Sequence, residues 1–439
     1  MKLEKMGVPT APVVTMVFAE LVKKVAYNGG MPNKRFTFVP HPIVAVPASV
    51  CRDYLQGNDP ITGKIVIQEI IEALTKPLTE PEKKVGFLER AEPRLLGPDT
   101  AGSLQNLFLK NGWTDYLPIV LPTEEKVAEM LKGTSRKPDE VVGKMQASGA
   151  HPMWSYTVEK VAVNAVMAGA KPEYFPVILA IASTGVTSLF TSTTSFARAV
   201  VVNGPIRNKI GMNSGIGSMG PFNHANATIG RAWTLVSLNL GGSGMPGVIY
   251  QGSQGSTVNY NNNCVPENEE ALPSGWEPLH VQKGFKPEES VVSVFSGWGI
   301  GRADFNRGGI IHVQIPFFLQ TCSPFAGATL YLDPLVAVRL KEEGFDTKKD
   351  LVQWAYKSSL IPIEDYWNKY QLIRTFNLPK GEKGVEPYAS WLKLPKDALK
   401  PRFEKPEDIT VLVVGGGTNP AWQLGDFKYI ASASVDKWR

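Results

Sequence analysis

The segment GMNSGIGSMGPFNHANATIGRAW, residues 211–233, combines closely spaced glycines with amide side chains, a histidine and an arginine. Glycine-rich turns expose successive backbone amides and let a ligand approach the main chain closely. A helix predicted from about Asn226 adds its own unpaired amides at the same place. His224 precedes this helix, where it can transfer protons or cap the helix. The segment therefore predicts an amide-lined pocket for a small anion, with tight turns packed on a core as the alternative.

The spacing G-x-G-x-x-G in residues 215–220 also matches the dinucleotide-binding fingerprint. That fingerprint needs a strand running directly into the first glycine and an acidic residue about 20 positions further on. Here the preceding predicted strand ends near Val202, Pro221 follows the last glycine, and residues 237–247 hold no carboxylate. The small-anion pocket is the better interpretation.

A second reactive group of residues lies in NNNCVPENEEALPSGWEPLH, residues 261–280, which contains Cys264, Glu267 and His280. A thiol, carboxylates and an imidazole can support nucleophilic or acid–base chemistry, or bind a metal. The segment has neither an H-E-x-x-H motif nor a regular ligand spacing. A buried, inert Cys264 is the alternative. His312, inside the apolar run IIHVQI, is expected in a strand as a core or edge residue, and His151 could be structural or functional.

Composition limits the class of protein. Of 439 residues 43% are hydrophobic, and the net charge of +5 is spread thinly, which gives no reason to expect nucleic-acid binding. The three cysteines lie far apart, so we expect neither a disulfide framework nor a zinc knuckle. We expect the protein in a reducing compartment. No apolar run reaches the roughly 18 residues of a membrane helix, so we expect a cytoplasmic protein with no membrane partner.

The pattern of elements predicts an α/β fold. Residues 7–76 alternate short β-rich and amphipathic pieces, which indicates βαβ units and a small parallel sheet. We expect a small α/β domain at 1–80, a linker or surface crossing at 81–118, and a larger α/β domain at 119–439 with long Gly/Asn/Ser-rich loops. Loops this long and polar are uncommon in a compact domain unless they serve function.

Several elements of the larger domain can be predicted individually. The runs 117–122 (LPIVLP), 291–299, 310–318 and 409–417 are expected as strands. The runs 335–344 and 349–359 are expected as helices, and Thr123 is expected to begin another.

Two stretches resemble known families. Residues 7–47, GVPTAPVVTMVFAELVKKVAYNGGMPNKRFTFVPHPIVAVP, resemble the UGSC family, named after its U/C-Gly-Ser-Cys motif, and the catalytic region of the B subunits of glycine, sarcosine and betaine reductases. The second stretch resembles the larger domain that accompanies the UGSC domain in some bacterial proteins. It comprises the runs TVEKVAVNAVMAGAKPEYFPVILA, VVNGPI, GPFNHANATIGRA and ENEEALPSGWEPLHVQKGF.

The departure from these relatives is informative. Their selenocysteine or cysteine motif stands upstream of the residues equivalent to Met1–Gly7. Here Cys51 follows the Pro-His-Pro at residues 40–42, and Ala170 occupies a position where a cysteine is expected. Chemistry that needs that thiol or selenol would therefore use a partner chain, a small Cys- or Sec-containing subunit docked near His41, and we expect an oligomer.

The resemblance implies an enzyme or catalytic subunit that acts on a small carboxylate- or amine-bearing substrate by reductive cleavage or lyase chemistry. His41 and His224 would transfer protons, and Cys264 with Glu267 would form a second reactive group. The expected substrate-binding residues are Asn203, Ser214, Gly215, Gly217, Asn226 and Arg231.

Two other functions stay open. The first is a metal-dependent hydratase or lyase that uses His224, Cys264, Glu267 or His280 as ligands, so a metal ion is the one cofactor we keep in view. The second is a non-catalytic subunit of a hetero-oligomer.

Overall fold

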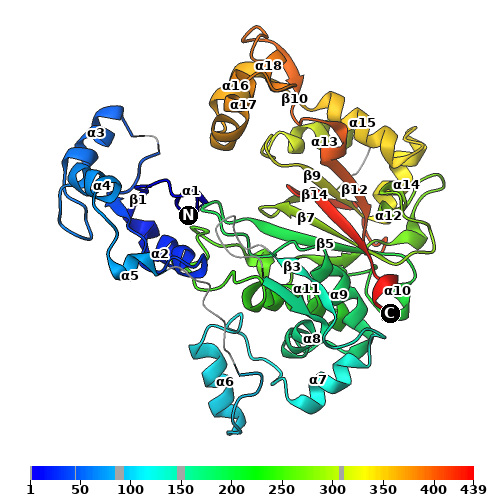
Figure 1. The fold of residues 1–439 in the computed structure, drawn as a ribbon. Helices are drawn as coiled ribbons and strands as arrows, with labels where there is room; N and C mark the ends of the chain where they lie inside the picture. The colour runs from blue at the N-terminus through cyan, green and yellow to red at the C-terminus, as the bar shows by residue number, and fades with distance from the viewer. Residues whose placement is uncertain (1, 45, 85–92, 146–153, 306–310) are drawn as a thin grey trace.

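The computed structural model describes residues 2–44, 46–84, 93–145, 154–305 and 311–439. Helices and strands combine in parallel and mixed sheets, which confirms the α/β class (Figure 1). Among the described helices, none has the length and apolar character that a membrane span requires.

The N-terminal elements lie together at one side of the molecule, drawn in blue in Figure 1. Strands β1 (Val13–Thr15) and β2 (Thr37–Val39) pair in parallel, as expected for this region. The helices of this N-terminal unit are α1 (Lys2–Lys5), α2 (Ala19–Asn28), α3 (Ala48–Gln56), α4 (Val66–Thr75) and α5 (Glu80–Lys83).

A buried carboxylate anchors β2. Asp59 accepts hydrogen bonds from the amides of Phe38 (2.6 Å), Ile61 (2.7 Å) and Thr62 (3.0 Å). Burial alone would raise the pKa of this carboxyl, but the three amides hold the pKa below its usual value. The outer edge of β2 is thus capped by a side chain.

The body of the molecule contains two four-stranded sheets. The first has the order β14-β7-β5-β6 and the second β12-β9-β13-β8. Their strands are β5 (Ala197–Asn203), β6 (Cys264–Pro266), β7 (Val291–Gly297), β8 (Ile300–Phe305), β9 (Ala328–Leu332), β12 (Ile409–Val413), β13 (Ala421–Gly425) and β14 (Lys428–Ser434). Within them β5 is parallel to β6 and β9 to β12, whereas the other neighbours are antiparallel.

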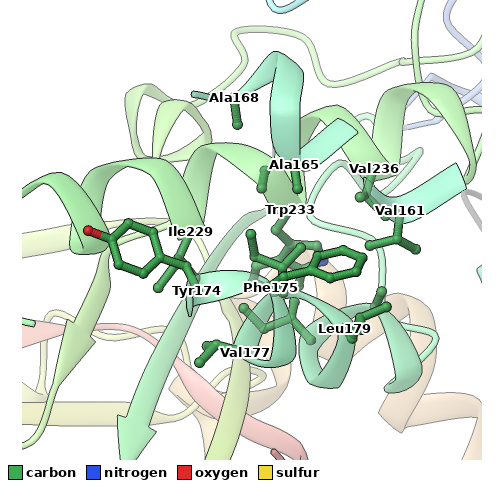
Figure 2. Packing of buried hydrophobic residues seen from close by; sticks show 14 of the residues in the cluster. Val161, Ala165, Ala168, Tyr174, Phe175, Val177, Leu179, Ile229, Trp233 and Val236 are labelled. Carbon is green, nitrogen blue, oxygen red and sulfur yellow. The ribbon is translucent and has the colours of Figure 1, made fainter. Parts of the chain in front are cut away.

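Three apolar helices pack beside the first sheet, two of them against its strands and the third on those two helices. They are α8 (Val158–Met167), α9 (Phe175–Ser183) and α11 (His224–Asn239). Figure 2 shows how Ala165, Phe175 and Trp233, one from each helix, meet in the largest buried cluster. A separate cluster, which includes Val201 of β5 and Leu412 of β12, joins the two sheets. The polar loops are therefore held on a large core.

The remaining elements surround this body. They are α6 (Ala101–Lys110), α7 (Glu124–Leu131), β3 (Val141–Met145), β4 (Trp154–Thr157), α10 (Ile206–Lys209), α12 (Leu279–Gln282), α13 (Ile311–Leu319), α14 (Pro334–Glu342) and α15 (Lys348–Ser358). A small C-terminal layer contains β10 (Leu360–Pro362), α16 (Ile363–Asn368), α17 (Leu378–Glu382), α18 (Tyr388–Trp391) and β11 (Leu399–Pro401).

Most predicted elements are present, and two predictions were wrong. The run at 310–318 is not a strand, because residues 311–319 form α13 and bury Ile311, Ile315 and Phe318 at helical spacing. LPIVLP is not a strand either. The Gln105 side chain donates to the Ile119 carbonyl (2.7 Å) and accepts from the Ile119 amide (3.4 Å), and thus takes the place of a strand partner.

Candidate functional site

His41 lies directly beyond the end of β2, next to the end of β1. Its Nδ1 is 3.2 Å from Oγ1 of Thr15, the last residue of β1, and its ring meets the Phe18 ring edge-on at 5.9 Å. The histidine is otherwise exposed. In open α/β sheets ligands bind at the carboxyl ends of parallel strands, so His41 occupies the edge where a substrate is expected.

The N-terminus of α2 is at the same edge. Phe18, whose ring contacts His41, is the N-cap residue of this ten-residue helix. A 3-10 turn, Met16–Phe18, leads directly into α2, and the Ala19 amide donates to the Met16 carbonyl, so the helical segment begins next to Thr15. The first amides of a helical segment have no intrahelical partners and, with the helix dipole, favour an anion. The edge therefore places an exposed imidazole beside a site suited to a carboxylate.

Apolar side chains surround this edge without being covered. Met16, Val17, Ile43 and Val44 are all exposed, Val44 to 60% of its surface. We call these four residues the apolar patch. Exposed apolar patches of this kind often mark contact sites for another chain.

The three cysteines differ sharply in accessibility. Cys51 lies half-buried on α3, in the N-terminal unit. Cys264 is buried in β6 and Cys322 is buried after α13, and burial raises the pKa of each thiol to about 12. The structure favours the inert interpretation of Cys264, because a thiolate is the nucleophilic form.

The glycine turns at 213–220 are held mainly by hydrogen bonds within the turns and to the side chain of Asn226. Asn226 is buried, and its side chain accepts from the Asn213 amide (3.1 Å) and donates to the carbonyls of Asn213 (3.0 Å) and Ser218 (3.1 Å). The Gly215 amide donates to the Asn213 side chain, and the Ser214 carbonyl accepts from the Gly415 amide. Asn226 thus orders the turn instead of facing a ligand.

These turns nevertheless line a cavity of about 540 Å³ at the carboxyl ends of β9 and β12. Gly217 contributes one wall, and Asp333, which follows β9, contributes another. Asp333 accepts from the amides of Leu335 (2.9 Å) and Gly417 (3.0 Å). The expected anion pocket therefore contains a carboxylate, which favours an amine-bearing group. Neither His224 nor His41 is among the described residues that line it.

His224 and Arg231 lie on α11 with other neighbours. His224 is exposed in the first turn, with its ring 5.8 Å from that of Tyr174. Arg231 makes a bidentate ion pair with Asp115, at 2.8 and 2.9 Å, and also donates to the Pro118 carbonyl. Its guanidinium is committed to holding the 115–118 turn.

Glu267 and Asn203 do meet, at the carboxyl ends of the parallel strands β5 and β6. Asn203 Nδ2 donates to Glu267 Oε2 (2.8 Å) and to Glu269 (2.9 Å). Glu267 also forms a fully buried ion pair with Lys348 of α15. Sequence reasoning missed Lys348, because its local context, TKKD, is typical of an exposed helix start.

His280 and His312 lie on short helices of the body of the molecule, α12 and α13. His280 is fully buried, and His151 is outside the described residues. The expectation of His312 in a strand was wrong, because it lies on helix α13, where it is exposed and its ring contacts Phe345 and Trp354. Within the part of the chain that the structure describes, no three His, Cys, Asp or Glu side chains gather as a metal ion would require.

Comparison with known proteins links the His41 edge to one family. A sequence model of the UGSC family matches residues 1–57, which include β1, β2 and His41. No curated protein and no solved structure matches the chain. The similarity thus supports a relation of residues 1–57 to the UGSC-motif family.

Proposed function

We propose that this chain is an enzyme subunit that acts on a small substrate bearing a carboxylate or an amine, with His41 as the group that transfers a proton. The observation that carries the proposal is the position of His41: exposed, oriented by Thr15 and located at the carboxyl edge of the parallel strand pair. This edge belongs to the segment that matches the UGSC family.

The substrate carboxylate would lie at the N-terminus of α2. The helical segment starts at the turn Met16–Phe18, which follows Thr15 and whose Phe18 ring contacts His41, so an anion there comes within reach of the imidazole. A bound acid positioned in this way could receive a proton on a departing amine or lose one from carbon. Both outcomes fit the reductive-cleavage and lyase chemistry that the resemblance implies.

A reductive cleavage also needs two electrons. A thiol or selenol pair supplies them when it becomes a disulfide or selenosulfide, while the broken substrate bond takes up the electrons and the His41 proton. Cys264 and Cys322 are buried thiols with raised pKa. We therefore propose that a second chain with a U/C-Gly-Ser-Cys motif supplies the pair and docks on the apolar patch.

The cavity lined by the glycine turns would bind an amine-bearing group, separately from the His41 edge. Gly217 and Asp333 line it, and an ammonium group would pair with the Asp333 carboxylate there. The substrate-binding roles expected for Gly215, Gly217 and Ser214 stay predictions.

Site-specific cross-linking tests the docking. The full chain would carry p-benzoylphenylalanine at Val44, in the apolar patch, and be illuminated in its native host, with the same label at exposed Leu399 of β11 as the control. We expect Val44, and not Leu399, to cross-link a chain that carries a U/C-Gly-Ser-Cys motif. Cross-links from Val44 to copies of this chain alone, or to the same chains as Leu399, would contradict the proposal.

A further inference from the structure

We propose that the outer edge of β1 accepts an extended, uncharged segment of the second chain, the one with the U/C-Gly-Ser-Cys motif, as a third strand parallel to β1. The identity of this partner rests on the proposed function, whereas the free edge does not depend on His41. Within the described residues the sheet beside His41 has two strands. Parallel sheets usually contain more strands and are covered on both faces, so we expect another strand to complete this one.

The register of the two strands shows which main-chain groups are free. Val13 lies opposite Thr37, and the Thr37 amide donates to the Pro12 carbonyl. Successive residues of a strand direct their N–H and C=O groups to opposite sides. Val14 therefore bonds to β2, whereas the N–H and C=O of Val13 point away from it. Neither of these two groups has a hydrogen-bond partner among the described residues.

The two edges of this sheet differ. On the outer edge of β2 the Phe38 amide donates to the Asp59 carboxylate at 2.6 Å, so this edge is closed. On the outer edge of β1 no described side chain bonds the main chain of Val13, and Val13 is 42% exposed. An added strand can therefore pair with β1 and not with β2.

The residues at the free edge suit an uncharged, apolar strand. Residues 8–19 contain no charged side chain, although exposed sheet edges usually carry charges that prevent pairing with another chain. Met16 and Val17 of the apolar patch follow β1 directly and are exposed, so the edge and the patch form one continuous surface. A partner docked on the patch would cover these side chains, while main-chain hydrogen bonds to Val13 would align its strand.

The position of His41 determines the direction of the added strand. Residues that follow parallel strands lie at one edge of a sheet, where α/β proteins bind their ligands. His41 lies at that edge, with its Nδ1 3.2 Å from the hydroxyl of Thr15, the last residue of β1. A partner strand parallel to β1 would bring the residues that follow it to His41, where the thiol or selenol pair has to act.

Hydrogen exchange at single-residue resolution tests the pairing. The full chain would be compared alone and in the assembly purified from its native host. The Val14 amide, which bonds to β2 in both states, is the internal control. We expect the Val13 amide to exchange about tenfold or more slowly in the assembly, because a hydrogen-bonded amide exchanges only after the strands separate.

Two results of this experiment would overturn the proposal. One is an equal rate of Val13 exchange in the isolated chain and in the assembly. The other is protection of Val13 in the isolated chain that increases with protein concentration, because a second copy of this chain would then occupy the edge.

Two substitutions at Val13 test the identity of the partner. Val13→Pro removes the free N–H but no bond to β2, and Val13→Thr is the matched control that keeps the N–H. We expect the assembly purified with Val13→Pro to contain about tenfold less of a chain with a U/C-Gly-Ser-Cys motif, and Val13→Thr to retain it. Equal retention by both variants would contradict the pairing. Intact thermal unfolding transitions confirm that both variants fold.

The strand pairing and the role of His41 fail separately. An unprotected Val13 amide in an assembly whose turnover is abolished by His41→Gln would overturn the strand pairing alone. A protected Val13 amide in an assembly that His41→Gln leaves fully active would overturn the role of His41 alone.

Discussion

The three cysteines have different surroundings, and those surroundings determine which of them can react. Cys264 and Cys322 are enclosed by apolar side chains, whereas Cys51 is partly accessible on α3. A sequence motif rich in thiol, carboxylate and imidazole groups can therefore be structural. By the same criterion of accessibility His41 is a better candidate for a reactive group, because its imidazole is exposed and is oriented by Thr15.

At the residue scale we predict selective alkylation. Iodoacetamide at pH 8 should modify Cys51 in the folded protein, because a thiol with a pKa of about 12 is roughly one part in ten thousand thiolate at that pH. Cys264 and Cys322 should react only after unfolding in urea. Peptide mass spectrometry gives the readout, with Cys51→Ser as the control. Alkylation of folded Cys264 at the rate of Cys51 would contradict its buried position.

The candidate residues also show what sequence could predict. The Pro-His-Pro after a β-rich run places His41 at a strand end, and the structure agrees because the signal is local. The partners of Arg231 and Glu267 could not be predicted, since Asp115 and Lys348 are far away in the chain and reach them only through tertiary folding.

Helices are predicted correctly where the local sequence determines them, and incorrectly where distant contacts decide. The helices α14 and α15 form where their sequence patterns predict them, and the structure adds that Thr347 begins α15 with a capping box to Asp350. The run at 310–318 is too apolar to distinguish a strand from a helix, and packing decides for α13.

The C-terminal layer contains a buried lysine whose protonation should affect stability. Lys400 of β11 is 3% exposed, its Nζ lies 4.1 Å from the ring centres of both Tyr366 and Trp391, and it donates to the Pro401 carbonyl. Burial lowers the pKa of Lys400 to about 7, although the Glu404 carboxylate opposes this effect.

We therefore predict a pH dependence at the element scale. Between the folded pKa of about 7 and the ordinary value of 10.5, the unfolded chain binds a proton that the folded chain has released. The free energy of unfolding should thus rise with pH from 7 to 9, by up to about 1.4 kcal/mol per unit from this group. Urea unfolding of the wild type and Lys400→Met measures the difference, with exposed Lys396→Met as the control. Equal pH slopes for the wild type and Lys400→Met would show that Lys400 keeps its ordinary pKa.

At the scale of the whole molecule, the two sheets are joined by polar contacts as well as by apolar packing. Glu267 follows β6 of the first sheet, and Lys348 begins α15, which packs on β12 of the second. Both side chains are at most 1% exposed, and Glu267 also accepts from Asn203 and from the Leu279 amide. The ion pair thus connects the first sheet to a helix that packs on the second sheet.

Removing one partner of this pair should be costly. Glu267→Gln leaves the Lys348 ammonium buried without a counter-charge, and we expect about 3–5 kcal/mol of lost unfolding free energy by urea titration. The double variant Glu267→Gln/Lys348→Met should lose less than the sum of the single losses. Lys341→Met, which breaks the surface pair with Asp346, is the control and should cost at most about 1 kcal/mol. If Glu267→Gln lost no more unfolding free energy than Lys341→Met, the ion pair would not stabilise the contact between the two sheets.

The role proposed for His41 can be measured as turnover by the native assembly that contains this chain. With a dithiol as the electron donor, the assembly would be offered glycine, sarcosine and betaine, and loss of substrate would be measured for the wild type, His41→Gln and His312→Gln. We expect turnover of at least one substrate, a fall in kcat of about 100-fold or more for His41→Gln, and a wild-type rate for His312→Gln. Turnover of none of the three, or a wild-type rate for His41→Gln, would contradict it.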